Sequence, residues 1–194
     1  MIQKNDITGI VLAGGKSSRI GSDKGFLTLN DSTFISHIIK AVEPLVNNII
    51  IVSNNSDYDI FNLKRVEDII EDAGPLAGLC SGLNESETEY NLVLSCDVPL
   101  INSAVLNKLI KGFDAEKDVI QLKSKNKTMP LIALYKKHCI HQCMDLLQKG
   151  ERRLRTAVKQ LNTKTIQLDP DLDQFVRNIN TLSELKELRS ELEH

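Results

Sequence analysis

The segment Ile7-Thr8-Gly9-Ile10-Val11-Leu12, followed by Ala13-Gly14-Gly15, decides the expected fold. Its apolar residues do not follow the strict apolar–polar alternation of a half-exposed strand. Such a run is typical of a strand that helices cover on both faces. The two glycines mark the point where the chain leaves the strand. We therefore expect residues 7–12 to form a buried strand of an α/β domain.

Apolar runs and helical periods alternate along the rest of the chain. Further buried strands are expected at Asn48–Ser53, Asn91–Ser95, Val119–Leu122 and Leu131–Tyr135. Helices are expected at Thr33–Leu45, from Pro75 onward, at Ser103–Phe113 with Ser103 as N-cap, at Lys137–Lys149, at Arg152–Leu161 and from Ser183 onward. This rhythm predicts a three-layer α/β/α fold with a mainly parallel, mixed sheet. A chain of 194 residues corresponds to a single domain, residues 1–194.

The composition argues against several classes of protein. Lys and Arg total 24 and Asp and Glu total 26, so the formal charge of −2 argues against a general nucleic-acid binder. No apolar run approaches the roughly 18 residues of a membrane-spanning helix, and the first residues lack the apolar stretch of a signal peptide. The four cysteines need form no disulfides in a reducing compartment. We expect a cytoplasmic protein with no nucleic-acid or membrane partner.

The loop after the first strand combines glycines with basic residues. Gly14 and Gly15 lack a Cβ, so the backbone there can approach a ligand closely and direct N–H groups at anionic oxygens. Lys16, Arg19 and Lys24 add three positive charges within nine residues, against one aspartate. Neither the P-loop pattern nor the dinucleotide fingerprint G-x-G-x-x-G matches this loop. Its charge alone leaves two interpretations open, a phosphate-binding loop or a β–α turn with solvated lysines.

A longer motif in this loop is more specific than its charge. Leu12-Ala13-Gly14-Gly15-x-Ser17-x-Arg19-Ile20-Gly21, followed by Asp23-Lys24, resembles the signature of nucleotidyltransferases with a Rossmann-like, glycosyltransferase-A-like fold. The doubled glycine resembles the molybdenum cofactor guanylyltransferase branch, the MobA family. Further matches follow in the family's order: Gly74-Pro75-Leu76-Ala77-Gly78, Ser95-Cys96-Asp97-Val98-Pro99, Pro130 before a strand, Gly150-Glu151-Arg152-Arg153 and Asn178-Ile179-Asn180-Thr181.

The resemblance implies an enzyme that transfers GMP from GTP to the phosphate of Mo-molybdopterin and releases pyrophosphate. It implies Mg²⁺ as cofactor, Asp97 as its ligand, and catalytic roles for Arg19, Lys24 and Asp97. Nucleotide binding is expected at Leu12, Ala13, Gly14, Gly15, Lys24, Asp68 and Asp97, and substrate binding at Arg152, Arg153, Asn178 and Asn180. Transient contact with molybdoenzyme maturation proteins is a further expectation. Cytidylyl transfer, transfer to a sugar phosphate and a non-catalytic nucleotide-binding role remain alternatives.

The positions of two aspartates suggest their chemistry. Asp97 ends an expected strand, so its carboxylate should emerge at the edge of the sheet where α/β proteins bind ligands. Mg²⁺ in proteins commonly takes one or two carboxylates together with substrate phosphates. An aspartate that caps the next turn is the alternative. Asp68 lies in an acidic stretch, and a solvated acidic loop is the alternative there.

Two polar segments complete the expected site. Ser53 to Asn55 close the second strand and could hydrogen-bond a guanine or a ribose. Some members of the family that this sequence resembles carry asparagine at the position of Ser53. Because the sequence departs from the family there, guanine recognition is expected mainly at the Leu12–Gly14 backbone. Asn178 and Asn180 fall on one side of an extended segment. A turn capped by Asn180 or Thr181 is the alternative for that segment.

The cluster His138-Cys139-Ile140-His141-Gln142-Cys143 invites a zinc interpretation. A closed zinc site needs about four ligands. One short helix turns by about 100° per residue and cannot direct all four side chains at one ion. The sequence therefore favours a helix with incidental histidines.

Overall fold

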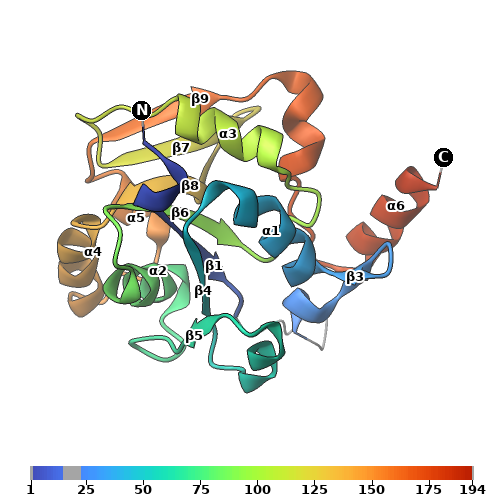
Figure 1. The fold of residues 1–194 in the computed structure, drawn as a ribbon, viewed down its shortest axis with the longest axis horizontal. Helices are drawn as coiled ribbons and strands as arrows, with labels where there is room; N and C mark the ends of the chain where they lie inside the picture. The colour runs from blue at the N-terminus through green and yellow to red at the C-terminus, as the bar shows by residue number, and fades with distance from the viewer. Residues whose placement is uncertain (1, 15–22, 194) are drawn as a thin grey trace.

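The computed structural model describes residues 2–14 and 23–193, and within them seven strands form one sheet (Figure 1). The spatial order is β5-β4-β1-β6-β8-β7-β9. The strands are β1 (Ile7–Leu12), β4 (Asn48–Val52), β5 (Lys64–Val66), β6 (Tyr90–Ser95), β7 (Val119–Ser124), β8 (Lys127–Lys136) and β9 (Thr163–Gln167). Only β8 runs antiparallel to its neighbours β6 and β7 among the described strands of this sheet. The prediction of a mainly parallel, mixed sheet is confirmed.

Helices cover both faces of the sheet, which confirms the three layers (Figure 1). One face carries α1 (Phe34–Val42) and α3 (Ser103–Lys111), and the other carries α2 (Gly74–Glu85), α4 (Cys139–Gln148) and α5 (Leu154–Val158). Short 3₁₀ helices are η1 (Lys4–Asp6), η2 (Lys24–Phe26), η3 (Glu43–Leu45), η4 (Ser56–Phe61) and η5 (Pro170–Val176). None of the helices in the described ranges has both the length and the apolar character needed to cross a membrane.

Strand β1 is the centre of the parallel part of the sheet. It pairs with β4 on one side and β6 on the other. Its successive side chains point to opposite faces. Ile7 and Val11 join the buried cluster under α1 and α3, while Ile10 and Leu12 join the cluster under α2. Both faces of β1 are therefore buried, as its apolar run predicts.

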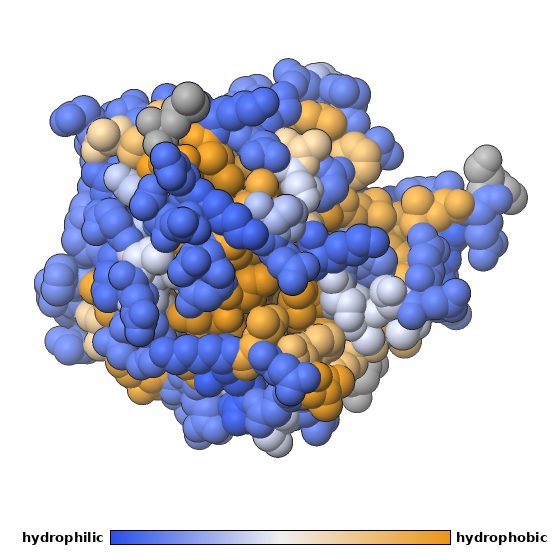
Figure 2. Space-filling view, in the orientation of Figure 1, coloured by the Kyte–Doolittle hydropathy of each residue, from blue (hydrophilic) through white to orange (hydrophobic). Residues whose placement is uncertain are grey.

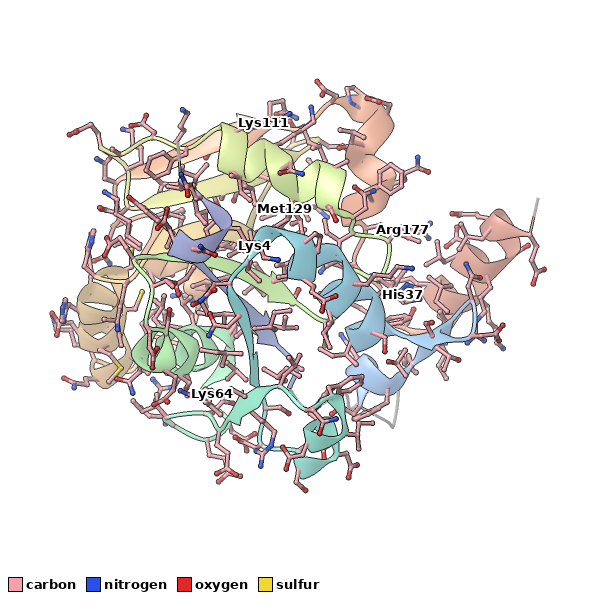
Figure 3. All side chains as sticks on the ribbon, in the orientation of Figure 1. Lys4, His37, Lys64, Lys111, Met129 and Arg177 are labelled. Atoms are coloured by element: carbon pink, nitrogen blue, oxygen red, sulfur yellow. The ribbon has the colours of Figure 1, made fainter. Side chains whose placement is uncertain are left out.

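Helix α6 (Leu182–Leu192) stands apart from the sheet, beside the hairpin of β2 (Thr28–Leu29) and β3 (Ser32–Thr33) (Figure 1). A small apolar cluster holds the two together, formed by Leu29, Phe34, Ile179, Leu185 and Leu188. Arg177, labelled in Figure 3, adds ion pairs to Glu187 at 2.7 Å and Glu191 at 2.9 Å. Figure 2 shows that hydrophobic residues also reach the surface on α6.

Three strand segments lack a signal in the sequence. β5 and β9 are the edges of the sheet and have no buried residue, and the β2–β3 hairpin has two residues on each side. An edge strand that buries little needs no apolar run, so its sequence resembles a loop.

Pro130 lies inside β8 and not before it, which corrects the expected strand start. The β7–β8 register shifts between Gln121 and Leu122 at this point, and such a bulge tolerates a residue without an N–H.

The start of α3 also differs from the expectation. Asn102 is the N-cap, and its side chain accepts a hydrogen bond from the backbone N–H of Val105 at 3.0 Å. Ser103 is the first helical residue, and its hydroxyl donates to the carbonyl of Ala41 at 3.0 Å. Asparagine and serine are both strong N-cap residues, so their order alone did not distinguish them. The serine instead joins α3 to α1.

Helix α2 lies close to β1 because two glycines face the strand. A Cβ on Gly82 would lie 2.4 Å from Ile10 Cγ2, and one on Gly78 would lie 3.4 Å from Leu12 Cδ2. The two glycines are four residues apart and so share one face of the helix. Together they set the distance between α2 and the strand that leads into the first loop.

The variant Gly82→Ala is expected to lower the free energy of unfolding by about 1–3 kcal/mol, because the added methyl overpacks the contact with Ile10. Alanine alone should favour the helix by about 1 kcal/mol, so a net loss identifies packing as the dominant effect. Urea denaturation followed by circular dichroism measures the change. Asn84→Ala, at an exposed position of the same helix, is the control. Unchanged or increased stability in Gly82→Ala contradicts this packing.

Candidate active site

A cleft of about 700 Å³ lies at the carboxyl ends of the parallel strands. β1, β4 and β6 run in the same direction, so the loops that follow them leave from one edge of the sheet. The loops after β1, β4 and β6 line the cleft, together with the segment after β5 and the start of α2. The lining includes Leu12, Gly14, Asp23, Lys24, Ser53, Asn54, Asn55, Asp68, Gly74, Pro75, Gly78, Cys96 and Asp97. The structure thus brings the first loop and the Asp97 loop around one cavity.

Lys24 enters this cleft from a short helix. Asp23 caps η2, accepting a hydrogen bond from the Gly25 N–H at 3.0 Å, and Lys24 is the first residue of that helix. The Lys24 ammonium Nζ donates to Asn180 Oδ1 at 2.7 Å. The contact orients a partly buried positive charge at the cleft.

Asp97 directly follows β6 and has both carboxylate oxygens oriented. Ser95 Oγ donates to Oδ1 at 2.5 Å, and Asn178 Nδ2 donates to Oδ2 at 2.8 Å. The backbone carbonyl of Asp97 accepts from the Ile179 N–H at 2.8 Å. A carboxylate has about four lone-pair positions, so these two bonds leave it able to bind a cation.

The segment Asn178–Asn180 therefore joins both candidate catalytic residues. Asn178 contacts Asp97 and Asn180 contacts Lys24. The capping alternative also holds, because Thr181 is the N-cap of α6 and forms a capping box with Glu184. The two interpretations of this segment are compatible, since different residues serve them.

Asp68 lies half-buried in the wall of the cleft, against α2, where a Cβ on Gly78 would lie 3.4 Å from its Oδ1. Its backbone N–H donates to Asn54 Oδ1 at 2.8 Å, which joins the loops after β4 and β5. Burial raises the pKa of the Asp68 carboxyl, and the nearby Asp72 carboxylate raises it further. Asp68 is therefore a partly desolvated wall residue and not a freely solvated loop aspartate.

The sequence predicts guanine recognition at the backbone of Leu12–Gly14, and the structure supports this expectation only in part. The Leu12 carbonyl accepts from the Cys96 N–H at 3.1 Å, and the Ala13 N–H donates to the Val52 carbonyl at 2.9 Å. The sheet thus already uses these two groups. At Gly14, by contrast, an added Cβ would have one neighbour among the described residues within 4 Å, Ser53 Oγ at 4.0 Å. Gly14 is exposed, and its surroundings among the described residues are open.

Four further residues are predicted to bind nucleotide or substrate or to act in catalysis, and none of them is among the described residues that line the main cleft. Gly15 and Arg19 lie outside the described residues. Arg152 Nη1 donates to the Leu147 carbonyl at 2.8 Å, so this side chain closes the end of α4 and does not line the cleft. Arg153 lines a second cavity, where its guanidinium pairs with Glu151 at 3.1 Å. Hydrogen bonds from the Arg153 guanidinium and from the backbone N–H groups of Arg153 and Arg152 hold the pKa of the Glu151 carboxyl low, at about 2.

The second cavity, of about 490 Å³, adjoins the first, and the two share Pro75, Ser95 and Leu131. Four basic residues line it, namely Lys127, Arg153, Arg155 and Lys159, together with apolar residues that include Met129, labelled in Figure 3. Sequence reasoning missed three of the four cations. Their only signal is the four-residue spacing of Arg155 and Lys159, which is common on solvated helices. Asn178 lines this cavity as well.

Within the described residues the cysteines do not gather with His, Asp or Glu into a metal-ligand cluster, and Cys96 in the cleft is not ionised. Cys139 and Cys143 are free and fully buried, and the described part of the chain holds no group of three or more His, Cys, Asp or Glu side chains suited to a metal. Cys96 lines the main cleft, but burial raises the pKa of its thiol to about 12, and the charges of Asp97 and Asp23 add to this effect. Cys96 is therefore a neutral thiol at neutral pH.

Known proteins resemble this chain in sequence and in fold. The model of the MobA-like NTP transferase domain family matches residues 9–165. The "Probable molybdenum cofactor guanylyltransferase" of Flavobacterium johnsoniae is 33% identical over 96% of this chain and 98% of its own length. The "Molybdenum cofactor guanylyltransferase" of Desulfosudis oleivorans is 32% identical over 93% of each chain. Molybdopterin-guanine dinucleotide biosynthesis protein A from Archaeoglobus fulgidus shares the fold, with a TM-score of 0.80 at 22% identity over 96% of this chain and 98% of that one. This chain belongs to the family of MobA-like NTP transferase domains.

Proposed function

We propose that this protein transfers GMP from GTP to the terminal phosphate of Mo-molybdopterin and releases pyrophosphate. The observation that carries the proposal is the convergence of Gly14, Lys24 and Asp97 on one cleft beside a second, cationic cavity. Family membership and relatives matched over nearly their full length support the choice of reaction. Cytoplasmic location and contact with maturation proteins stay predictions of the sequence.

The transfer needs no covalent enzyme intermediate. A phosphate oxygen of the pterin attacks the α-phosphorus of GTP, a new phosphorus–oxygen bond forms, and the bond to the β-phosphate oxygen breaks as pyrophosphate leaves. Positioning and charge stabilisation supply most of the rate in such reactions. Lys24 stabilises the charge that develops on the leaving group. We assign the same role to Arg19, from its place in the motif.

Asp97 fits the role of a magnesium ligand. Its carboxylate supplies hard oxygen donors at the cleft, and Ser95 and Asn178 fix its orientation. Mg²⁺, when bound, would neutralise charge on the triphosphate. Ser95 and Asn178 act on the carboxylate itself, because each restrains one of its two oxygens.

The second cavity is proposed to hold the pterin substrate. Its cations, Lys127, Arg153, Arg155 and Lys159, suit a phosphate-bearing acceptor, and its apolar residues suit a flat ring system. Asn178 lines this cavity and also donates to Asp97, so it stands between acceptor and nucleotide. An acceptor phosphate placed there lies next to the cleft that holds GTP.

A pyrophosphate-release assay with GTP and Mo-molybdopterin tests the function. We expect release with GTP and Mg²⁺, loss of release on chelation with EDTA, and recovery when Mg²⁺ is restored. CTP should support a much lower rate. No release with GTP contradicts the proposal, and equal or faster release with CTP assigns the protein to cytidylyl transfer.

The variants Lys24→Ala and Asp97→Asn are each expected to lower kcat/KM by about 100-fold, a loss of about 2.7 kcal/mol of transition-state stabilisation. Both residues are partly exposed at the cleft, so the thermal midpoint should change little. Steady-state pyrophosphate release and thermal denaturation measure the two effects. Lys111→Ala, on α3, and Asp145→Asn, on α4, are matched controls at exposed positions (Lys111 is labelled in Figure 3). Near-normal turnover in both site variants contradicts their proposed roles.

The double variant Arg155→Ala/Lys159→Ala is expected to raise the KM for Mo-molybdopterin by about tenfold, a loss of about 1.4 kcal/mol, through lost contacts to phosphate. The KM for GTP should stay within about twofold, because both residues line the second cavity. Initial rates measured while each substrate is varied in turn separate the two constants. Lys149→Ala, at an exposed position after α4, is the control. An effect on GTP alone contradicts the assignment of this cavity to the acceptor.

A further inference from the structure

The carboxylate of Asp23 is held by three donors from two separate segments of the chain. Tyr58 Oη donates to Oδ1 at 2.5 Å, and the Gly25 N–H donates to the same oxygen at 3.0 Å. Asn55 Nδ2 donates to Oδ2 at 3.2 Å. Asn55 and Tyr58 follow β4, where Asn55 is the N-cap of η4 and Tyr58 lies within it, so they reach Asp23 from a different loop. The proposed transfer assigns no role to any of these contacts.

The Tyr58 side chain is built into this position. Its ring is fully buried and stacks on Phe26, with the centroids 4.6 Å apart. A second ring, that of Phe61, lies 6.3 Å away. Burial raises the pKa of the Tyr58 hydroxyl well above its usual range, with further contributions from Cys96 and the Asp23 carboxylate. The hydroxyl therefore keeps its proton and donates a hydrogen bond to Asp23.

Gly25 leaves the space that this hydroxyl occupies. A Cβ at position 25 would lie 2.0 Å from Tyr58 Oη, which no packing tolerates. Gly25 is buried, and its N–H also donates to Asp23. The glycine after Lys24 thus allows the tyrosine to reach the carboxylate that caps η2. An aspartate that only capped a helix would not need this access.

Lys24 lies directly next to this arrangement. It follows Asp23 in the chain, begins η2, and extends its ammonium to Asn180 Oδ1 at 2.7 Å. Tyr58 fixes the Asp23 side of the short helix, and Asn180 fixes the far end of the lysine. The position of the Lys24 ammonium relative to the cleft therefore depends on where Asp23 is held.

We propose that Tyr58 is a positioning residue for the transfer reaction: its hydroxyl holds the Asp23 carboxylate and, through η2, sets the place of the Lys24 ammonium. This role rests on the proposed function of the cleft. A positioning role means that loss of the Tyr58 hydroxyl lowers kcat but leaves the affinity for GTP almost unchanged. The positive charge of Lys24, which attracts the nucleotide, is still present in such a variant.

The variant Tyr58→Phe tests the role, because it keeps the stacked ring and removes only the hydroxyl. We expect kcat for pyrophosphate release to fall about tenfold while the Kd for GTP stays within about threefold. Tyr90→Phe, at the opposite end of β6 from Asp97, is the matched control and should leave kcat unchanged. A kcat within about twofold of the wild type in Tyr58→Phe overturns the proposal.

A double-mutant cycle separates positioning from a general structural effect. In the Lys24→Ala background, Tyr58→Phe should lower kcat no further, because the group that it positions is absent. A second tenfold loss in that background overturns the route through Lys24.

If Tyr58→Phe does not fold, Asp23→Ala removes the partly exposed end of the same contact. A kcat within about twofold of the wild type in Asp23→Ala then overturns the proposal. A wild-type protein without any pyrophosphate release contradicts the proposed function instead, so the two failures are distinguishable.

Discussion

The parallel pairing of β1 with β4 and β6 is the constraint on which the whole site depends. In this register Leu12 lies opposite Val52 on one side and Ser95 on the other. Three segments of the chain therefore leave the sheet along one line, at the edge where the cleft lies. A shift of one residue would turn every side chain of a strand to the opposite face. The two apolar clusters of the core exclude that shift, because each takes alternate residues of β1.

The site also depends on the segment before α6, which has to hold Asn180 next to Lys24. Glu184 Oε2 accepts hydrogen bonds from the backbone N–H groups of Asn180 at 2.6 Å and Thr181 at 3.0 Å. The start of α6 thereby fixes the backbone that presents Asn180 to Lys24. Single hydrogen bonds contribute only about 0.5–1.5 kcal/mol, or up to about 3 kcal/mol when one partner is charged. Their effect here is on geometry more than on the stability of the fold.

The sequence predicts the parts of the molecule that are governed by local pattern. The apolar run of β1 and the position of Asp97 after β6 follow from periodicity and chain order, and the motif of the first loop adds Gly14 and Lys24. The contact of Lys24 with Asn180 spans 156 positions, and no spacing rule relates such residues. The same holds for Tyr58 and Asp23, 35 positions apart, which meet only because the loop after β4 lies beside the first loop.

Other differences arise where one residue type suits two roles. Arginine suits both phosphate binding and the closure of a helix, and only the fold separates Arg152 at the end of α4 from Arg153 at the second cavity. The backbone of Leu12 and Ala13 could face a base in an extended chain, but the sheet uses these groups first. Edge strands such as β9 bury too little to leave an apolar pattern.

The contacts of Asn178 and Asn180 at the cleft join residues that are synthesised far apart in time. Strands β1, β4 and β6 have all been synthesised once the chain reaches residue 95. Asn178 and Asn180, which bond Asp97 and Lys24, come more than 80 residues later, whereas Ser95, the other partner of Asp97, is already present. A chain synthesised only as far as residue 177 lacks both contacts, so Lys24 and Asp97 are without these two restraints.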